Sequence, residues 1–210
     1  MPINIENNKE ILCLVEAFTK DTLGDEKPKG NCFRLSYPLS LYLTNKGHVN
    51  SIRTGHYNYK VVNKHNPSHV WLTLDKDPEI IIDITGKQFD ENMPLIYRGK
   101  PDEYEEGNIT FKEFYDDWLR SFTTNGFFDY IQDPIDKADL SALLKINLKA
   151  AIILNNEKGI DITTSKKYFS AIYKILCFNW DTIQLFKNEL PKDFNVLELK
   201  AKEWYKAAAE

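Results

Sequence analysis

The sequence predicts an α+β core followed by a mostly helical section. Residues 69–75 (HVWLTLD) and 79–85 (EIIIDIT) have the composition of two β-strands around a turn, whereas the second half of the chain repeats apolar residues at helical spacing. The 210 residues suffice for one domain, or for a core with an appendage, since domains usually run to roughly 100–200 residues. We expect a core over about 1–100 and a helical extension over about 108–210.

Two helices are expected at the start of the core. Residues 8–23 place apolar side chains at helical spacing, and a second apolar helix in residues 31–47 is closed by Gly47. Pro38 lies inside this second helix, where proline removes a backbone hydrogen bond and clashes with the previous turn. Either the helix is kinked there, or Ser36 caps a new start.

The two strands are expected to pair as an antiparallel hairpin after an earlier strand within residues 49–62. The turn is predicted at Lys76-Asp77-Pro78. If the hairpin is centred on Lys76, His69 lies opposite Asp83 on one face, with Cβ atoms about 4.5–5.5 Å apart. A register shifted by one residue would put the two side chains on opposite faces, so the pairing depends on register.

The rest of the chain is predicted to be irregular and then helical. After Gly86 no clear pattern appears up to about 108, and the acidic run 102–106 (DEYEE) is expected to be a solvated loop. Thr110 and Glu113 form a T-x-x-E capping box that opens a helix over 111–122. Further helices are expected at about 137–156, 164–189 and 195–207.

Charge and hydropathy exclude several classes of function. The net charge is −4, and the Lys and Arg residues are scattered, which argues against nucleic-acid binding. No apolar run approaches the roughly 20 residues that a membrane-spanning helix needs. The N-terminal MPINIENNKE lacks the basic and apolar regions of a secretory signal. We therefore expect a cytoplasmic protein, or an effector delivered without a visible signal, while the oligomeric state stays open.

The three cysteines do not form the pattern of a disulfide framework, because their number is odd and they lie far apart. Cys13 and Cys177 lie in apolar runs and are expected to be buried and inert. All four histidines fall within residues 48–69, which together with Cys32 raises the alternative of a zinc site. Their spacings fit no standard ligand pattern, so no metal is predicted.

Cys32 has a different setting, because it follows Gly30-Asn31 at the start of an apolar helix. Unpaired backbone N–H groups at a helix start stabilise a thiolate and can form part of an oxyanion hole. His69 at a strand start could take the thiol proton, and Asp83 could fix the tautomer of His69. An unpaired buried carboxylate is costly, so Asp83 needs a partner. These three residues predict a catalytic triad.

The order GNC at a helix start, HVW opening a strand and IIDIT in the next strand resembles the papain-like, transglutaminase-like superfamily of cysteine enzymes, over roughly residues 28–90. The resemblance implies Cys32 as nucleophile, His69 as base and then acid, and Asp83 as its orienting residue. DITGKQF resembles a D-x-T-x-x-Q-F ending of a small bacterial and phage branch. The implied activity is hydrolysis of an amide or isopeptide bond in a protein or peptide, as a peptidase or glutamine deamidase, without a cofactor. Acyltransferase or transglutaminase-like activity is the alternative.

Two features depart from the superfamily pattern. Pro38 interrupts the helix of the nucleophile, and no glutamine shortly before Cys32 completes an oxyanion hole. Asn31 or Gln88 could take that place, and Trp71 is a further candidate for substrate binding.

A different class of function is also open, in which the chain is a non-catalytic protein-interaction module. The helical half holds many aromatic residues in a short span, which can mark a partner surface. They are Trp118, Phe122, Phe127, Phe128 and Tyr130. Selective reaction of Cys32 with iodoacetamide near pH 6 would distinguish an enzyme from such a module.

Overall fold

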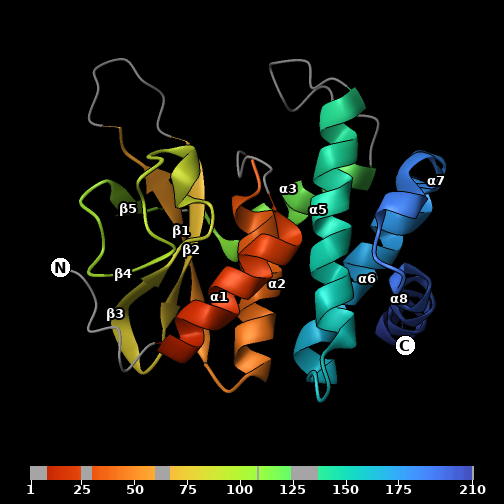
Figure 1. The fold of residues 1–210 in the computed structure, drawn as a ribbon, viewed down its shortest axis with the longest axis horizontal. Coiled ribbons are helices and arrows are strands. Elements are labelled where there is room, and N and C mark those ends of the chain that lie inside the picture. Colours follow the sequence, from red (N-terminus) through yellow and green to blue (C-terminus); the bar gives the residue numbers. More distant parts are fainter. Residues whose placement is uncertain (1–8, 25–29, 60–66, 108, 124–136, 210) are drawn as a thin grey trace. The chain divides into compact units, whose positions relative to one another are not determined.

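The computed structural model describes residues 9–24, 30–59, 67–107, 109–123 and 137–209. It combines helices with one antiparallel sheet, which confirms the predicted α+β class (Figure 1). The chain divides into two compact units, 1–115 and 116–210. The first contains the sheet and the second is helical. The division of function between the two parts stays a prediction.

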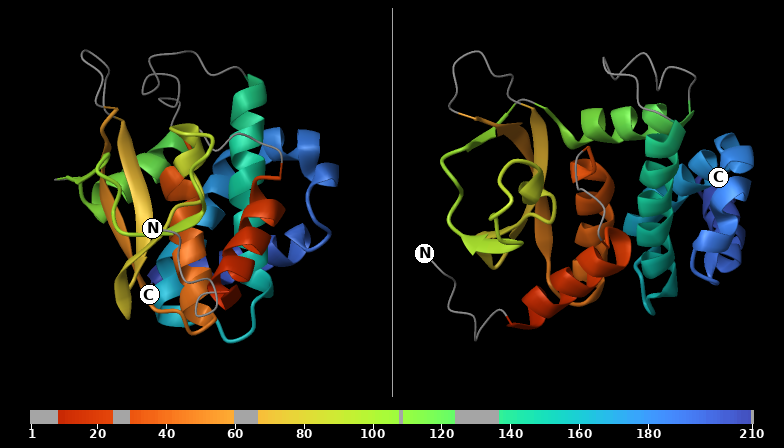
Figure 2. Two further views of the ribbon diagram at one scale, coloured as in Figure 1. Left: turned by 60° about the vertical axis from the view of Figure 1, so that its left-hand side comes forward. Right: turned by 45° about the horizontal axis from the view of Figure 1, so that its top comes forward.

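Two helices lie against one face of the sheet in the first unit, as Figures 1 and 2 show. They are α1 (Lys9–Thr22) and α2 (Cys32–Asn45), close to their predicted bounds. Leu35, Leu39 and Leu43 recur every four residues on α2 and are fully buried where this helix packs against the sheet. The apolar spacing of α2 therefore fixes which side of its N-terminus faces the strands.

Helix α2 continues through Pro38 as one α-helix. The Ser36 hydroxyl donates a hydrogen bond to the backbone oxygen of Val70 at 3.4 Å, so Ser36 does not cap a new helix start. The contact joins α2 to the strand that follows His69. Of the two alternatives for this helix, the new start at Ser36 is wrong.

The sheet has five antiparallel strands in the order β4-β3-β2-β1-β5. The strands are β1 (Asn50–Tyr57), β2 (Ser68–Leu74), β3 (Asp77–Ile82), β4 (Ile96–Arg98) and β5 (Tyr104–Glu106). Strands β4 and β5 lie in the stretch that was predicted to be irregular. Three-residue strands are too short to show a clear alternation, and the solvated loop predicted at 102–106 is wrong because β5 pairs with β1 there.

The register of the β2–β3 hairpin differs from the prediction by two residues. Leu72 pairs with Ile82, whereas a turn centred on Lys76 would pair it with Ile80. An irregularity between Thr73 and Leu74 produces this offset, and β3 ends at Ile82, so His69 and Asp83 are not a directly opposed pair. Because an offset of two residues keeps every side chain on its predicted face, the two residues still meet.

Side chains on both faces of the sheet are buried. Trp71 and Ile81 belong to a cluster with Tyr57 and Tyr104, and Tyr59, Phe89, Met93 and Tyr97 pack against it. The alternate residues on the same two strands are buried as well: Val70, Leu72, Ile80 and Ile82. The first of these two groups is rich in aromatic rings and contacts His69.

Helix α3 (Phe111–Thr123) opens with the predicted capping box. The Thr110 N–H donates to Glu113 Oε2 at 2.6 Å, and the Glu113 N–H donates to Thr110 Oγ1 at 3.2 Å. Trp118 and Phe122 of this helix are buried, which removes them from an exposed partner surface. Phe127, Phe128 and Tyr130 lie outside the described residues.

Among its described residues, the second unit packs four further helices, α5 (Lys137–Asn156), α6 (Ile162–Phe178), α7 (Trp180–Phe186) and α8 (Phe194–Ala209). The single helix predicted over 164–189 is broken at Asn179, whose side-chain amide donates to the Phe122 and Ile175 carbonyls at 2.7 and 2.9 Å. Within the described ranges, no helix has the length and apolar character needed to cross a bilayer.

Cys13 and Cys177 are exposed, so the prediction that both are buried is wrong. On α1 the buried stripe is Ile11, Val15, Phe18 and Thr22, and Cys13 lies off it. A cysteine within an apolar run can thus face solvent when the rotation of the helix places it outside the buried stripe.

Candidate active site

His69 and Asp83 form a buried pair at the end of the hairpin away from its turn. His69 is the second residue of β2, and Asp83 directly follows β3. His69 Nε2 lies 2.6 Å from Asp83 Oδ2, and the two residues are 0% and 1% exposed. The predicted contact is therefore present, although the strand register that was expected to produce it is not.

The Asp83 carboxylate receives four hydrogen bonds. Oδ2 accepts from His69 and from the Tyr104 hydroxyl, and Oδ1 accepts from the Thr85 N–H at 2.9 Å and the Thr85 hydroxyl at 3.0 Å. Burial favours the neutral acid, but the charge of His69 and these hydrogen bonds outweigh it and lower the pKa of Asp83. Asp83 is thus held ionised beside the imidazole.

The His69 imidazole is held in its charged form by its neighbours. Burial disfavours the imidazolium, yet Asp83 and the Cys32 thiol together raise the pKa of His69 to about 9. Because Nε2 is occupied by Asp83, Nδ1 is the nitrogen left for the thiol. No described group makes an ordinary hydrogen bond with Nδ1, while Cys32 lies close enough to act on the imidazole. Catalytic hydrogen bonds are often poorly aligned in resting enzymes and tighten when substrate binds.

Aromatic rings enclose the imidazole of His69. Phe89 meets it edge-on at 4.7 Å between ring centroids, Tyr104 edge-on at 5.2 Å, and Trp71 lies nearly parallel at 5.9 Å. Trp71 is itself 0% exposed, so it packs against His69 and has no exposed surface that a substrate could contact. These contacts fix the ring orientation and keep water away from the pair.

Cys32 is the first residue of α2, as predicted. Its N-cap residue, Asn31, is buried and makes no side-chain capping hydrogen bond to the first N–H groups of the helix. The Arg34 guanidinium donates to the Gly30 carbonyl and lies near the thiol. Burial lowers the pKa of Arg34 to about 10, and the charge of Cys32 opposes this shift. Cys32 thus lies at a helix start and close to a guanidinium.

Gln88 reaches the same helix start from the other side. Its Oε1 accepts a hydrogen bond from the Gly30 N–H at 3.3 Å, whereas its buried Nε2 has no partner in the described part of the chain. The preceding turn is tight, since a Cβ atom on Gly86 would lie 2.3 Å from Met93 Sδ and 3.0 Å from Asp83 Oδ2. The D-x-T-x-x-Q spacing therefore lets the chain turn back after Asp83, so that the Gln88 side-chain amide reaches the residues before Cys32.

Tyr104 and Arg34 are among the residues of the site that were not predicted from the sequence. Tyr104 was assigned to a solvated acidic loop, yet it is 1% exposed and donates to Asp83. The signal in the sequence that could have indicated its burial is an aromatic residue within an otherwise acidic run. Arg34 gave no signal, because a charged residue in the first turn of a helix usually faces solvent.

The described histidines do not join His69 in a metal-ligand cluster. His48 Nε2 lies 3.7 Å from Glu10 Oε1, His56 is on β1, and His65 is outside the described residues. Within the described ranges, no three His, Cys, Asp or Glu side chains come together in a way that could hold a metal ion.

Comparisons with known proteins give no relative: no family model, no curated protein and no solved structure matches the chain. The fold and the site define an α+β protein in which a cysteine at a helix start lies near a buried histidine–aspartate pair. The resemblance to papain-like and transglutaminase-like enzymes therefore stays a prediction from the residue pattern.

The raised pKa of His69 predicts how stability depends on pH. The folded value of about 9 exceeds the ordinary value of 6.5, so the stabilisation is complete below about pH 6.5 and is lost as the pH rises through about 9. The free energy of unfolding should fall by up to about 3 kcal/mol over this range. Urea unfolding between pH 6 and 9.5 measures it. His69→Gln should lack this fall, and equal slopes in the two proteins would contradict the assignment.

Proposed function

We propose that the chain is a cysteine-dependent hydrolase of amide or isopeptide bonds, acting on a protein or peptide as a peptidase or glutamine deamidase. The observation that supports it most is the buried His69–Asp83 pair, whose remaining nitrogen, Nδ1, is left for the thiol at the start of α2. In this proposal, residues 1–100 form a papain-like or transglutaminase-like catalytic core, and the helical extension recognises the substrate.

The proposed reaction begins with attack of the Cys32 thiolate on the amide carbonyl. The carbonyl carbon becomes tetrahedral, and its oxygen takes the negative charge. His69, charged at neutral pH, gives the Nδ1 proton to the leaving nitrogen, and the C–N bond breaks to leave a thioester on Cys32. Water then attacks the thioester while His69 takes its proton, which releases the acid and restores the thiolate. An amine in place of water would give acyl transfer.

The oxyanion has two sources of hydrogen bonds in this proposal. One is the set of N–H groups at the start of α2, which the Asn31 side chain does not cap. The other is the Gln88 Nε2 amide, which is buried without a partner beside Gly30. A buried donor left unpaired costs free energy in the resting protein, and a developing oxyanion would satisfy it.

A buried charged pair is weak evidence for stability alone. Desolvation of two charges can exceed their attraction, and apolar residues of the same size are often as stabilising. Here Tyr104 and Thr85 add hydrogen bonds that keep Asp83 ionised. The ionised carboxylate stabilises the charged form of the imidazole, which apolar side chains in its place would not do. An acid–base residue requires such a shifted pKa, and here the surrounding groups shift the pKa of one imidazole.

The proposed activity can be tested with three kinds of peptide substrate. One contains glutamine side chains, one offers a series of backbone amide bonds, and one contains an isopeptide bond. Mass spectrometry after incubation would distinguish cleavage, deamidation and transfer to added amine. The proposal predicts at least one of these products with the native protein and none with Cys32→Ala. Equal product with both proteins would contradict it.

Replacement of Gln88 by alanine is expected to lower the turnover rate by about 10²–10³-fold, because removal of one oxyanion donor has effects of that size elsewhere. The melting temperature should change little, since the Gln88–Gly30 hydrogen bond is long and near the surface. Lys87→Ala, a change at the exposed neighbouring residue, is the matched control. Gln88 would have no such role if both variants turned over substrate at the native rate.

A further inference from the structure

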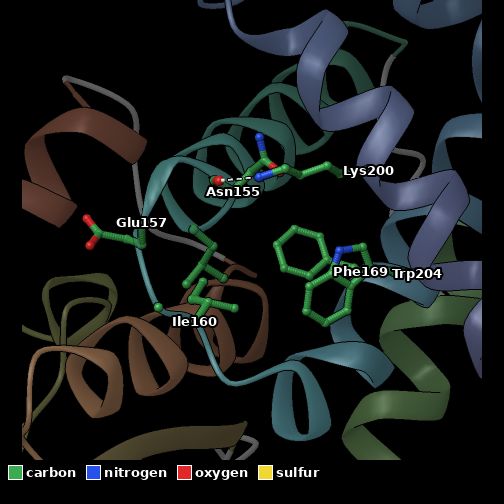
Figure 3. A pocket seen from close by; sticks show the side chains of 8 residues that line it. Asn155, Glu157, Ile160, Phe169, Lys200 and Trp204 are labelled. Carbon is green, nitrogen blue, oxygen red and sulfur yellow. Dashed lines mark hydrogen bonds between the residues drawn. The ribbon is translucent and has the colours of Figure 1, made fainter.

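The helical unit contains a pocket that the proposed hydrolase reaction does not use. It has a volume of about 230 Å³ and lies between the end of α5, the turn that follows it, α6 and α8 (Figure 3). Its lining is Leu154, Asn155, Glu157, Gly159, Ile160, Phe169, Lys200 and Trp204. A dry cavity of about 150 Å³ can hold benzene, so this pocket can hold one ring with a short chain.

Most of the pocket wall is apolar. Leu154 and Phe169 are buried at 0% and 2% exposure, and Ile160 and Trp204 are partly exposed. The Phe169 and Trp204 rings lie 5.0 Å apart at 44°. Flat aromatic surfaces beside branched aliphatic side chains favour a planar or compact apolar body.

A positive charge lies over one side of the pocket. Lys200 Nζ donates to the Asn155 backbone oxygen at 3.4 Å, a long hydrogen bond, and has no carboxylate partner within the described residues. Figure 3 shows Glu157 pointing away from the other labelled side chains, so its carboxylate does not face Lys200. The ammonium is therefore available to an anion.

The second polar feature is the Asn155 side-chain amide. Asn155 is only 6% exposed, and neither its Nδ2 nor its Oδ1 has a hydrogen-bond partner in the described part of the chain. Buried amides are normally paired, because an unpaired donor or acceptor costs free energy. Asn155 and Lys200 lie next to each other in Figure 3, so one head group can meet both.

We propose that this pocket binds a small carboxylate whose body is apolar and about one ring in size. The body lies against Ile160, Phe169 and Trp204, and the carboxylate accepts from Lys200 and from the Asn155 amide. An ionised carboxylate supplies a negatively charged partner for the Lys200 ammonium. It also supplies a hydrogen-bond acceptor for Asn155 Nδ2. This site does not depend on Cys32 or on the proposed reaction.

Calorimetric titration of the full chain with 3-phenylpropionate and with its uncharged amide tests the proposal. The acid should bind saturably, and the amide should bind at least about tenfold more weakly, since a charge-assisted hydrogen bond is lost. Lys200→Met should weaken binding of the acid by a similar factor. Lys202→Met, at an exposed lysine of the same helix, should leave it unchanged.

The variants also separate the pocket from a general attraction to lysine. Ile160→Trp should fill the pocket and abolish binding of the acid, and a thermal melt confirms that this variant is folded. Lys200 is exposed, so Lys200→Met keeps the test available if Ile160→Trp does not fold. Absence of saturable binding, equal affinity for acid and amide, or equal effects of the two lysine changes would each overturn the proposal.

Discussion

Replacement of Cys32 by alanine is expected to lower the turnover of an amide substrate by at least about 10⁴-fold, because no other group can form the thioester. That loss corresponds to about 5.5 kcal/mol of transition-state stabilisation. His69→Ala should cost a similar factor, since the thiol then loses both its base and the acid that protonates the leaving group. The rate of product formation under saturating substrate measures both losses.

The double variant adds a sharper test of the same prediction. Residues that act as one unit are strongly non-additive, so Cys32→Ala with His69→Ala should be hardly slower than either single variant. Cys13→Ala and Cys177→Ala, which remove the two exposed thiols, are the matched controls and should retain the native rate. Independent, additive losses at Cys32 and His69 would show that the two residues do not work together.

Asp83→Ala is expected to lower the free energy of unfolding by about 3–5 kcal/mol, the cost of breaking a buried pair by removing one partner. His69, Tyr104 and Thr85 would all lose the acceptor that they share. Asp83→Asn keeps the size and one acceptor oxygen, so its loss should be smaller. Urea unfolding of the three proteins at pH 7 measures these differences.

The control for Asp83 is an exposed carboxylate of the same hairpin. Asp75 accepts one hydrogen bond from the Ser51 hydroxyl at 2.8 Å, and Asp75→Ala should cost no more than about 1 kcal/mol. Similar losses at the two positions would mean that the Asp83 carboxylate does not hold the site together.

The site was predictable from the sequence where side-chain alternation alone decided the outcome. His69 and Asp83 were expected on one face, and they meet although the hairpin register is displaced by two residues. Only an odd displacement would have separated them. The start of α2 at Cys32 was likewise predictable, because the apolar repeat of the helix begins there.

Other features could not be predicted, because long-range contacts determine them. Tyr104 joins Asp83 through β5, a three-residue strand that exists only by pairing with β1. The exposure of Cys13 depends on the rotational phase of α1, which a short apolar run leaves open. The single long helix expected over 164–189 ends at Asn179, whose amide binds a carbonyl of α3, a residue 57 positions away.

Competition among the three thiols for iodoacetamide at pH 6 tests the catalytic role of Cys32 most directly. A thiol with an ordinary pKa near 8.5 is only about 0.3% ionised at that pH. Cys13 and Cys177 are exposed, whereas Cys32 is only partly exposed, so accessibility alone would favour the first two. We expect Cys32 to be alkylated first, and His69→Ala to remove its advantage. Preferential labelling of Cys13 and Cys177, with Cys32 unreactive until the protein unfolds, would contradict the triad.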